Sequence, residues 1–273
     1  MFIPSVDSTK HKSTFDGFYR GIVINVDDPL LSGRVRVRVY PMFEGVNDDV
    51  LPWAILADPN FGGSANEGKF SIPTVGAHVF VFFENGDHRF PVYFAGAPAI
   101  QDGVPDIPTL SREDDGTVAA IDSAASKGVS TASGGSWDEP DSAYAAIYPN
   151  NKVYRSAKGI LIEIDDTEDN VRFHVYHPSG SRVEVDNDGN VVEHVSATKT
   201  TVVIGDDNIE VKGKQDTTTG GDHGVKVGGN GKVKVTGNYD IECVGNVTIA
   251  ASGNAEVSAG GIVTVSGSLI NLN

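Results

Sequence analysis

Cysteine, methionine and tryptophan are scarce: the 273 residues include one, two and two of them. One cysteine excludes a disulfide framework within the chain and a zinc site of the CxxC type. No apolar run reaches the ~18 residues that span a bilayer. The first residues, Met1 to Ser5, lack the basic and apolar stretches of a secretory signal. We therefore expect a soluble protein that is made in the cytoplasm.

Basic charge is also in short supply. The chain has 21 Lys and Arg against 37 Asp and Glu and a net charge of −16. Each of the segments 1–100, 101–150, 151–204 and 205–273 has more acidic than basic residues. Nucleic-acid binding depends on neutralising phosphates with Lys and Arg, so this balance argues against a nucleic-acid partner. Trp53 and Trp137 lack the setting of stacked aromatic and basic residues that oligonucleotide-binding barrels use.

Helical periodicity is almost absent, and Val118 to Lys127 is the one candidate for a short helix. Elsewhere apolar and polar residues alternate, as on strands with one buried face. The stretches from Val35 to Val39 and from Ile160 to Ile164 show this pattern. The sequence therefore predicts an all-β protein.

Composition divides the chain into five parts. Residues 1–14 form an N-terminal arm, and residues 15–100 hold five or six strand candidates, which suits a small barrel. Residues 101–147 are rich in Asp, Ser, Ala, Gly and Pro and indicate a linker, because they cannot bury enough apolar surface to offset their ordering entropy. Residues 148–204 return to strands separated by Gly-containing turns. Residues 205–273 carry a repeat.

The repeat has a period of eight. Glycine occupies eight consecutive positions at this spacing, and the residue that follows it is usually Asn or Asp. This pair favours a tight turn, because Gly, Asn and Asp tolerate positive φ. The repeat glycines are Gly205, Gly213, Gly221, Gly229, Gly237, Gly245, Gly253 and Gly261.

Within each octad, the fifth and seventh residues counted from the glycine fall on one face of a short strand. Seven of the eight fifth residues are β-branched aliphatics, and the seventh residues become smaller toward the C-terminus. We expect these inward side chains to form a core. The core candidates are Ile209, Val211, Val225, Val227, Val233, Val235, Ile241, Cys243, Ile249, Val257 and Val265.

One short strand with two inward side chains cannot make a core by itself. Eight residues are also too few for the coil of a single-chain solenoid, whose repeats usually run to ~20 residues or more. Three copies that each contribute one strand per layer would close a prism and leave no sheet edge. The octads therefore predict an intertwined, homotrimeric β-helix. Its last 31 residues contain one charge, Glu256, which suggests a needle that narrows toward Asn273.

Several motifs outside the octads point to a family. They are Gly21-Ile22-Val23, Asp28-Pro29, Gly33-Arg34-Val35-Arg36-Val37-Arg38-Val39, Leu51-Pro52-Trp53-Ala54, Pro73-Thr74-Val75-Gly76, Glu84-Asn85-Gly86-Asp87, Pro91-Val92-Tyr93, Trp137-Asp138-Glu139-Pro140, Tyr148-Pro149-Asn150-Asn151, Ile162-Glu163-Ile164-Asp165-Asp166-Thr167 and His174-Val175-Tyr176-His177-Pro178-Ser179-Gly180. Together with the octads, they resemble the central spike proteins of contractile phage-tail baseplates. These proteins are related to the spike proteins of type VI secretion systems.

The resemblance implies an N-terminal OB-fold barrel, the linker, a β-prism over residues 148–204 and a triple-stranded β-helix over residues 205–273. It also implies a homotrimer that docks on a baseplate hub protein in the virion tail. When the sheath contracts, this trimer would be driven through the host outer membrane.

Two features of some family members are missing. The insert 101–147 is too short for a lysozyme domain, and no His-x-His motif is present to bind iron at the needle tip. We therefore expect no catalytic residue, metal or other cofactor. A small PAAR-like protein would cap the tip.

Polar clusters elsewhere do not indicate catalysis. Asp165, Asp166, Glu168 and Asp169 fit an acidic turn between strands better than a Ca²⁺ loop. The seven histidines show no ligand spacing. Cys243 would be a packed, inert thiol, with an interchain disulfide as the alternative.

The preferred interpretation is a non-enzymatic spike that punctures the host envelope mechanically, and three alternatives stay open. A type VI or extracellular injection system would use the same scaffold, although the short N-terminal arm argues against the type VI version. A tail-associated wall hydrolase would need a catalytic insert. A receptor-binding fibre tip would display aromatics, and residues 243–273 contain none.

Overall fold

The structure is a computed structural model that describes residues 15–57, 69–108, 140 and 142–271. The described residues form strands, turns and two short 3₁₀ helices, Asp48–Val50 and Glu84–Gly86, so the expected all-β class is confirmed. The expected helix at 118–127 lies outside the described residues. The chain divides into two compact units, Met1–Thr218 and Thr219–Asn273.

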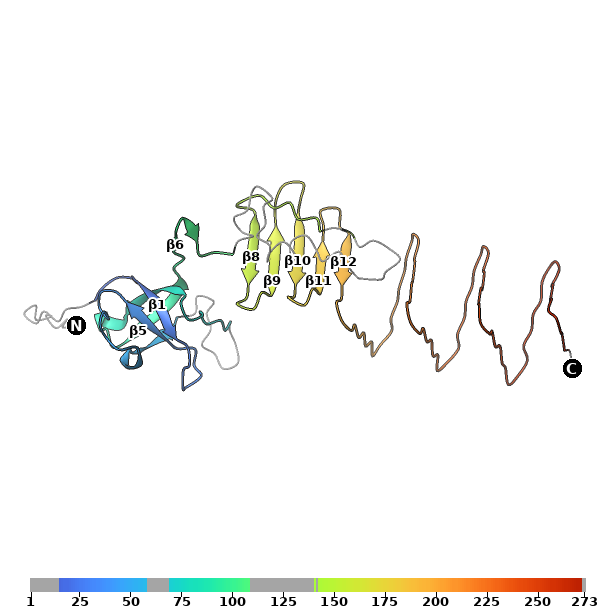
Figure 1. Cartoon of the computed structure of the whole chain (residues 1–273), viewed down its shortest axis with the longest axis horizontal. Helices are drawn as coiled ribbons and strands as arrows, with labels where there is room; N and C mark the ends of the chain where they lie inside the picture. The colour runs from blue at the N-terminus through green and yellow to red at the C-terminus, as the bar shows by residue number, and fades with distance from the viewer. Residues whose placement is uncertain (1–14, 58–68, 109–139, 141, 272–273) are drawn as a thin grey trace, which may run out of the picture. The chain divides into compact units, whose positions relative to one another are not determined.

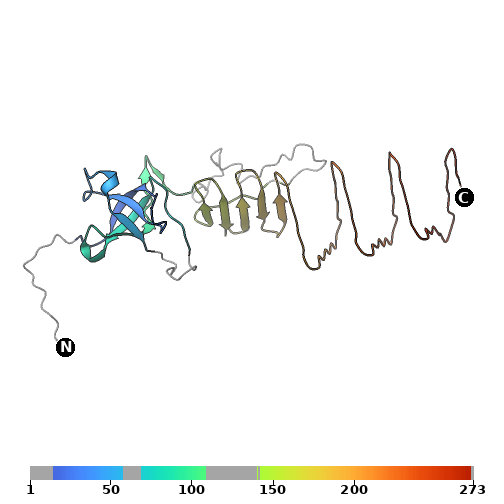
Figure 2. The ribbon, with the colours of Figure 1, turned by 90° about the horizontal axis from the view of Figure 1, so that it is seen from below.

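The first part is a closed five-stranded barrel (Figures 1 and 2). Its strands are β1 (Tyr19–Asn25), β2 (Val35–Val39), β3 (Trp53–Leu56), β4 (His78–Phe83) and β5 (Pro91–Gly96), in the order β1-β2-β3-β5-β4. Strands β3 and β5 pair in parallel, and the other neighbours are antiparallel. The small barrel predicted from the alternating pattern is confirmed.

Alternation along β2 and β4 builds the barrel core. Val35, Val37 and Val39 point inward from β2, and Val79, Val81 and Phe83 point inward from β4. A side chain at Gly21 on β1 would bring a Cβ within 2.4 Å of Val37 Cγ1, so only glycine fits there. A short hairpin follows the barrel, made of β6 (Ile100–Gln101) and β7 (Val104–Pro105).

The second part is a five-stranded antiparallel sheet whose strands follow chain order (Figure 1). They are β8 (Asn151–Arg155), β9 (Leu161–Asp165), β10 (Arg172–Tyr176), β11 (Arg182–Val185) and β12 (Val191–His194). Gly159, Gly180 and Gly189 adopt positive φ in the connecting turns, which glycine permits without steric cost.

The octads form no strand in this chain. The chain bends at the glycine of every octad, including Gly229 and Gly253, and it runs extended between the bends. Residues 219–271 wind to and fro with open space between their limbs (Figures 1 and 2). These bends fall where the Gly-Asn and Gly-Asp pairs predict turns, but none of the repeat glycines adopts positive φ.

Candidate functional site

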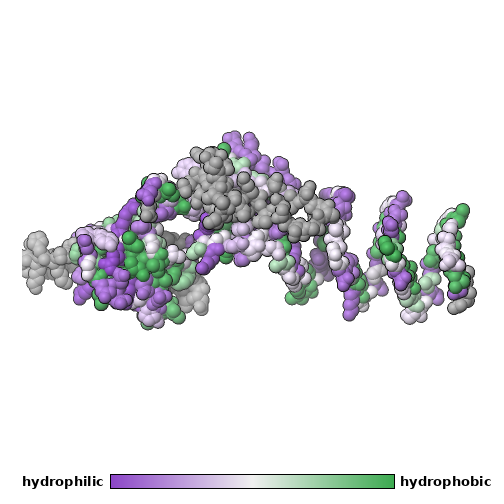
Figure 3. All heavy atoms as spheres, viewed as in Figure 1, coloured by the Kyte–Doolittle hydropathy of each residue, from purple (hydrophilic) through white to green (hydrophobic). Residues whose placement is uncertain are grey.

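The inward octad side chains lack cover in this chain. Their exposed fractions run from 46% at Val235 to 86% at Ile249, and Cys243 is a free, exposed thiol. No backbone–backbone hydrogen bond joins the described residues from 197 to 271. Exposed hydrophobic side chains therefore lie along the octad limbs, whose backbone is not hydrogen-bonded to another segment (Figure 3). The packed core predicted for these positions does not exist within one chain and stays a prediction for an assembly.

The repeat glycines also lack close neighbours within this chain. A Cβ added at any of them would meet no heavy atom within 4 Å. With no close contact and no positive φ, nothing within this chain requires glycine at Gly229, Gly237 or Gly245. Close approach by another chain would supply the missing reason.

The sheet β8–β12 also leaves an apolar face open. Ile162 and Ile164 on β9, Phe173 on β10 and Val183 on β11 share one face, because their registered partners lie opposite one another. These side chains are 37–47% exposed, and Tyr154 on β8 extends the face. An uncovered apolar face of this kind usually marks a contact surface.

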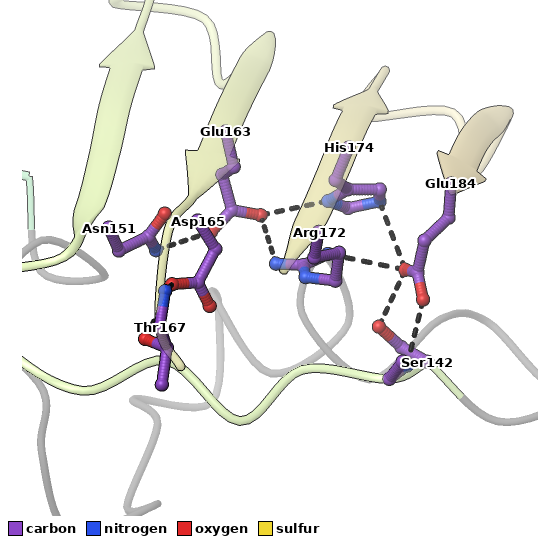
Figure 4. A network of polar contacts seen from close by, with 9 residues as sticks. Ser142, Asn151, Glu163, Asp165, Thr167, Arg172, His174 and Glu184 are labelled. Carbon is purple, nitrogen blue, oxygen red and sulfur yellow. Dashed lines mark hydrogen bonds and ion pairs between the residues drawn. The ribbon is translucent and has the colours of Figure 1, made fainter. Parts of the chain in front are cut away.

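Charged residues occupy the other, buried face of the same sheet (Figure 4). Arg172 donates one hydrogen bond to Glu163 Oε2 (2.8 Å) and another to Glu184 Oε2 (3.2 Å). His174 Nδ1 lies 2.8 Å from Glu163 Oε2, and Asn151 Nδ2 donates to Glu163 Oε1 (2.9 Å). Ionised groups enter a protein interior only when they are paired in this way.

Burial raises the pKa of Glu163, but opposing interactions outweigh it. The hydrogen bonds from His174 and Asn151 and the positive charge of Arg172 hold its pKa below the ordinary range. Glu163 is thus ionised at neutral pH. Among the described residues the network is not fully satisfied, because Arg172 Nε and His174 Nε2 are buried without a hydrogen-bond partner.

The end of the expected linker is fastened to this buried face. Residues 142–147, called the strap, lie along it: Ser142 Oγ donates to Glu184 Oε2 (2.6 Å), and the backbone N–H of Ile147 donates to Thr167 Oγ1 (3.0 Å) (Figure 4). The charged face therefore contacts a segment of its own chain. The apolar face stays exposed and is the face that another chain can contact.

The sequence pattern did not reveal this network. The available signal was the complementary charge at facing strand positions, with Glu163 opposite His174 and His174 opposite Glu184. Such pairs stabilise a sheet, but alternation alone does not say which face is covered.

On the barrel, Trp53 has a basic setting after all. The guanidinium carbons of Arg36 and Arg34 lie 4.7 and 5.7 Å from its ring centroid, so the expectation that Trp53 lacks such neighbours is wrong. Arg34 forms an ion pair with Asp28 at 2.5 Å, and Arg36 pairs with Asp49 at 3.8 Å. With both cations matched by carboxylates, this surface offers little attraction to a phosphate backbone.

The barrel also carries an exposed aromatic cluster. Phe18, which is 71% exposed, lies 5.2 Å from Phe94 and 6.3 Å from Phe82 between ring centroids. Arg20 lies over the ring of Phe80 at 5.3 Å. These rings stand on the outside of β4 and β5, where they form an apolar surface suited to protein contact.

Potential metal ligands do not cluster among the described residues. No group of three or more His, Cys, Asp and Glu there could hold a metal ion. A cleft of about 330 Å³ beside β4 and β5 includes His78, whose Nδ1 lies 3.7 Å from Asp106 Oδ2. The acidic turn after β9 is tied by Asp165, which accepts hydrogen bonds from Thr167 N and Oγ1. In the same described parts, no helix is long and apolar enough to cross a membrane.

A closed five-stranded barrel of this strand order has the architecture of an OB fold. Residues 19–97 match the family described as type VI secretion system/phage-baseplate injector OB domain, so the barrel is an OB domain of that family. The resemblance to baseplate spike proteins, inferred from the sequence motifs, is confirmed through this domain.

A relative extends the comparison. Over 91 residues, the chain is 38% identical to Protein Gp5 of Vibrio phage KVP40. The aligned segment covers 33% of this chain and 22% of that protein. The chain thus matches about a fifth of that relative's length.

Proposed function

We propose that the chain is the central spike of a contractile phage-tail baseplate and that it acts as a homotrimer. The OB domain match and the phage relative support the baseplate role. The spike would be a component of the virion tail, would dock on a baseplate hub protein and would carry a small PAAR-like tip cap.

The observation that carries the proposal is the exposure of the inward octad residues. Seven fifth-position side chains, from Ile209 to Val265, are at least 70% exposed, on segments that form no backbone–backbone hydrogen bond with any described residue. Exposed backbone and apolar side chains cannot offset the entropy of holding the chain extended. Copies wound around one axis would pair this backbone and bury these residues together.

The proposed action is mechanical and non-enzymatic. Hydrogen bonds between copies along the whole octad region would resist buckling, so that the force of sheath contraction reaches the host outer membrane. A type VI or extracellular injection system is a second candidate, because the description of the matched family names type VI secretion systems beside phage baseplates. The phage relative favours the first.

The molar mass of the full chain in solution, measured by light scattering, tests the proposal. We expect three times the chain mass of 28.8 kDa. A monomer would remove the physical basis of the spike.

A second assay addresses the hydrolase alternative. Zymography of the purified chain on peptidoglycan is expected to give no clearing, and a clearing band would identify a wall hydrolase instead.

A further inference from the structure

Identical or complementary residues recur at the same octad position in successive octads. The second position is Asn in four consecutive octads: Asn230, Asn238, Asn246 and Asn254. At the fourth position Lys232 is followed by Asp240, and at the sixth position Lys234 is followed by Glu242. In these two octads, complementary charges thus stand one octad apart at the fourth position and again at the sixth position, both of which face outward.

These charged side chains have no ion-pair partner among the residues that the structure describes. Lys232, Lys234, Asp240 and Glu242 are exposed, and none of them forms an ion pair with any described residue. By contrast, Lys214 is paired locally, with Asp216 at 2.8 Å. The four unpaired charges lie where the described residues form no backbone–backbone hydrogen bond to the next octad.

A trimeric arrangement determines which residues become neighbours, and this step rests on the proposed function. If three copies wind around a threefold axis and each octad advances the chain by one face, the next strand on a given face belongs to another copy. That strand is the octad one step further along the sequence. Strands on one face then run parallel, so equal octad positions lie side by side.

We propose that octads of different copies stack in register, offset by one octad, through polar columns on the outside of the spike. The Asn column forms an amide ladder between copies, as stacked Asn residues do in in-register sheets. Lys232 of one copy pairs with Asp240 of the next, and Lys234 pairs with Glu242 in the same way. The partner is a second copy of this chain, and these columns set the register in which the copies join.

The same register creates one unfavourable contact. Lys226, at the sixth position, comes to lie beside Lys234 of another copy. Like charges directly opposite each other on neighbouring strands destabilise a sheet. Removing this repulsion should therefore stabilise the trimer, whereas breaking one of the ion pairs should destabilise it.

Cysteine cross-linking of the full chain tests the register. In a Cys243→Ala background, Lys232→Cys with Asp240→Cys is expected to give a covalent trimer on a non-reducing SDS gel after oxidation. Neighbouring strands lie about 4.8 Å apart, within the ~4.4–6.8 Å between Cα atoms that a disulfide tolerates. The matched control, Lys232→Cys with Thr248→Cys, places the thiols two strands apart and is expected to stay uncross-linked.

Charge exchange tests the pairs themselves. Lys232→Glu should lower the temperature at which the trimer dissociates in SDS, and adding Asp240→Lys should restore it. Lys226→Glu should raise it. Glu256→Lys is the matched control, because its column neighbours Thr248 and Thr264 are uncharged, and it should change little.

The outcomes separate the two proposals. A monomeric wild-type chain overturns the proposed function and this inference together. If the wild-type chain is a trimer but only the control variant cross-links, or neither cysteine variant does, the proposed register alone is overturned. A trimer that cross-links as expected but ignores every charge change overturns the ion pairs.

Discussion

At the scale of single residues, Asp28 organises the loop that joins β1 to β2. Its carboxylate accepts hydrogen bonds from the backbone N–H groups of Leu30 and Ser32, from the hydroxyl of Ser32 and from the Arg34 guanidinium. The Arg34 interaction contributes most to holding the pKa of Asp28 far below its usual range. One buried carboxylate thus satisfies donors that the loop would otherwise leave unpaired.

Replacing Asp28 with Ala should therefore weaken the barrel. Several donors lose their acceptor together, and we expect the midpoint of barrel unfolding to fall by on the order of 10 °C. Thermal unfolding followed by Trp53 fluorescence measures the change. Asp27→Ala is the control, since Asp27 is its exposed neighbour. Equal midpoints for the two variants would contradict this role.

Residue-scale prediction from sequence was uneven for a physical reason. The Asp28-Pro29 and Gly33-Arg34 motifs signalled the barrel family, yet their spacing did not disclose that the Asp28 carboxylate binds the Arg34 side chain. Likewise Trp53 lies in β3, and its neighbour Arg36 comes from β2. Contacts across strands depend on register, which one sequence does not state.

At the scale of elements, the sheet β8–β12 reverses the usual arrangement within its own chain. Its charged face is buried under cover that includes the strap, and its apolar face is open. The alternating pattern predicted the strands correctly because period two is a property of the backbone. It could not say which face is covered, since the strap and any second copy are separate from the strands in sequence.

Glu163→Gln should destabilise this sheet, by about 2 kcal/mol at neutral pH, because Arg172 and His174 lose a charged acceptor. The folded pKa of Glu163 is lowered, so its contribution is present above the ordinary glutamate pKa and is lost as the pH falls through the lowered value. The variant should therefore lose less stability on acidification than the wild type.

Hydrogen exchange of peptides from residues 160–185, corrected for its intrinsic pH dependence, measures both effects. Glu193→Gln provides the control, because Glu193 forms only an exposed pair with Lys199. Parallel pH profiles for Glu163→Gln and the wild type would exclude the assigned role of the carboxylate.

At the scale of the whole molecule, the octads are the part that sequence describes best. Their period and inward positions are visible in the sequence, whereas in one chain the described octad residues form no backbone–backbone hydrogen bond and leave their inward side chains exposed. On the proposed function, the repeat reflects contacts with other copies, which a single chain does not display.

In such an assembly, stability should accumulate octad by octad, because each repeat contacts only its neighbours. Truncations after residues 252, 236 and 220 should lower the temperature at which the SDS-resistant trimer dissociates in successive steps. Band shifts on SDS gels after incubation at rising temperature measure this.

If the first truncation already abolished the trimer, the terminal octads alone would hold the copies together. If none had an effect, the open sheet face of Ile162, Ile164 and Phe173 would hold the copies together without the octads. A graded loss is the result expected when stiffness is built from many equivalent layers, and such layers are what a shaft needs to carry force along its length.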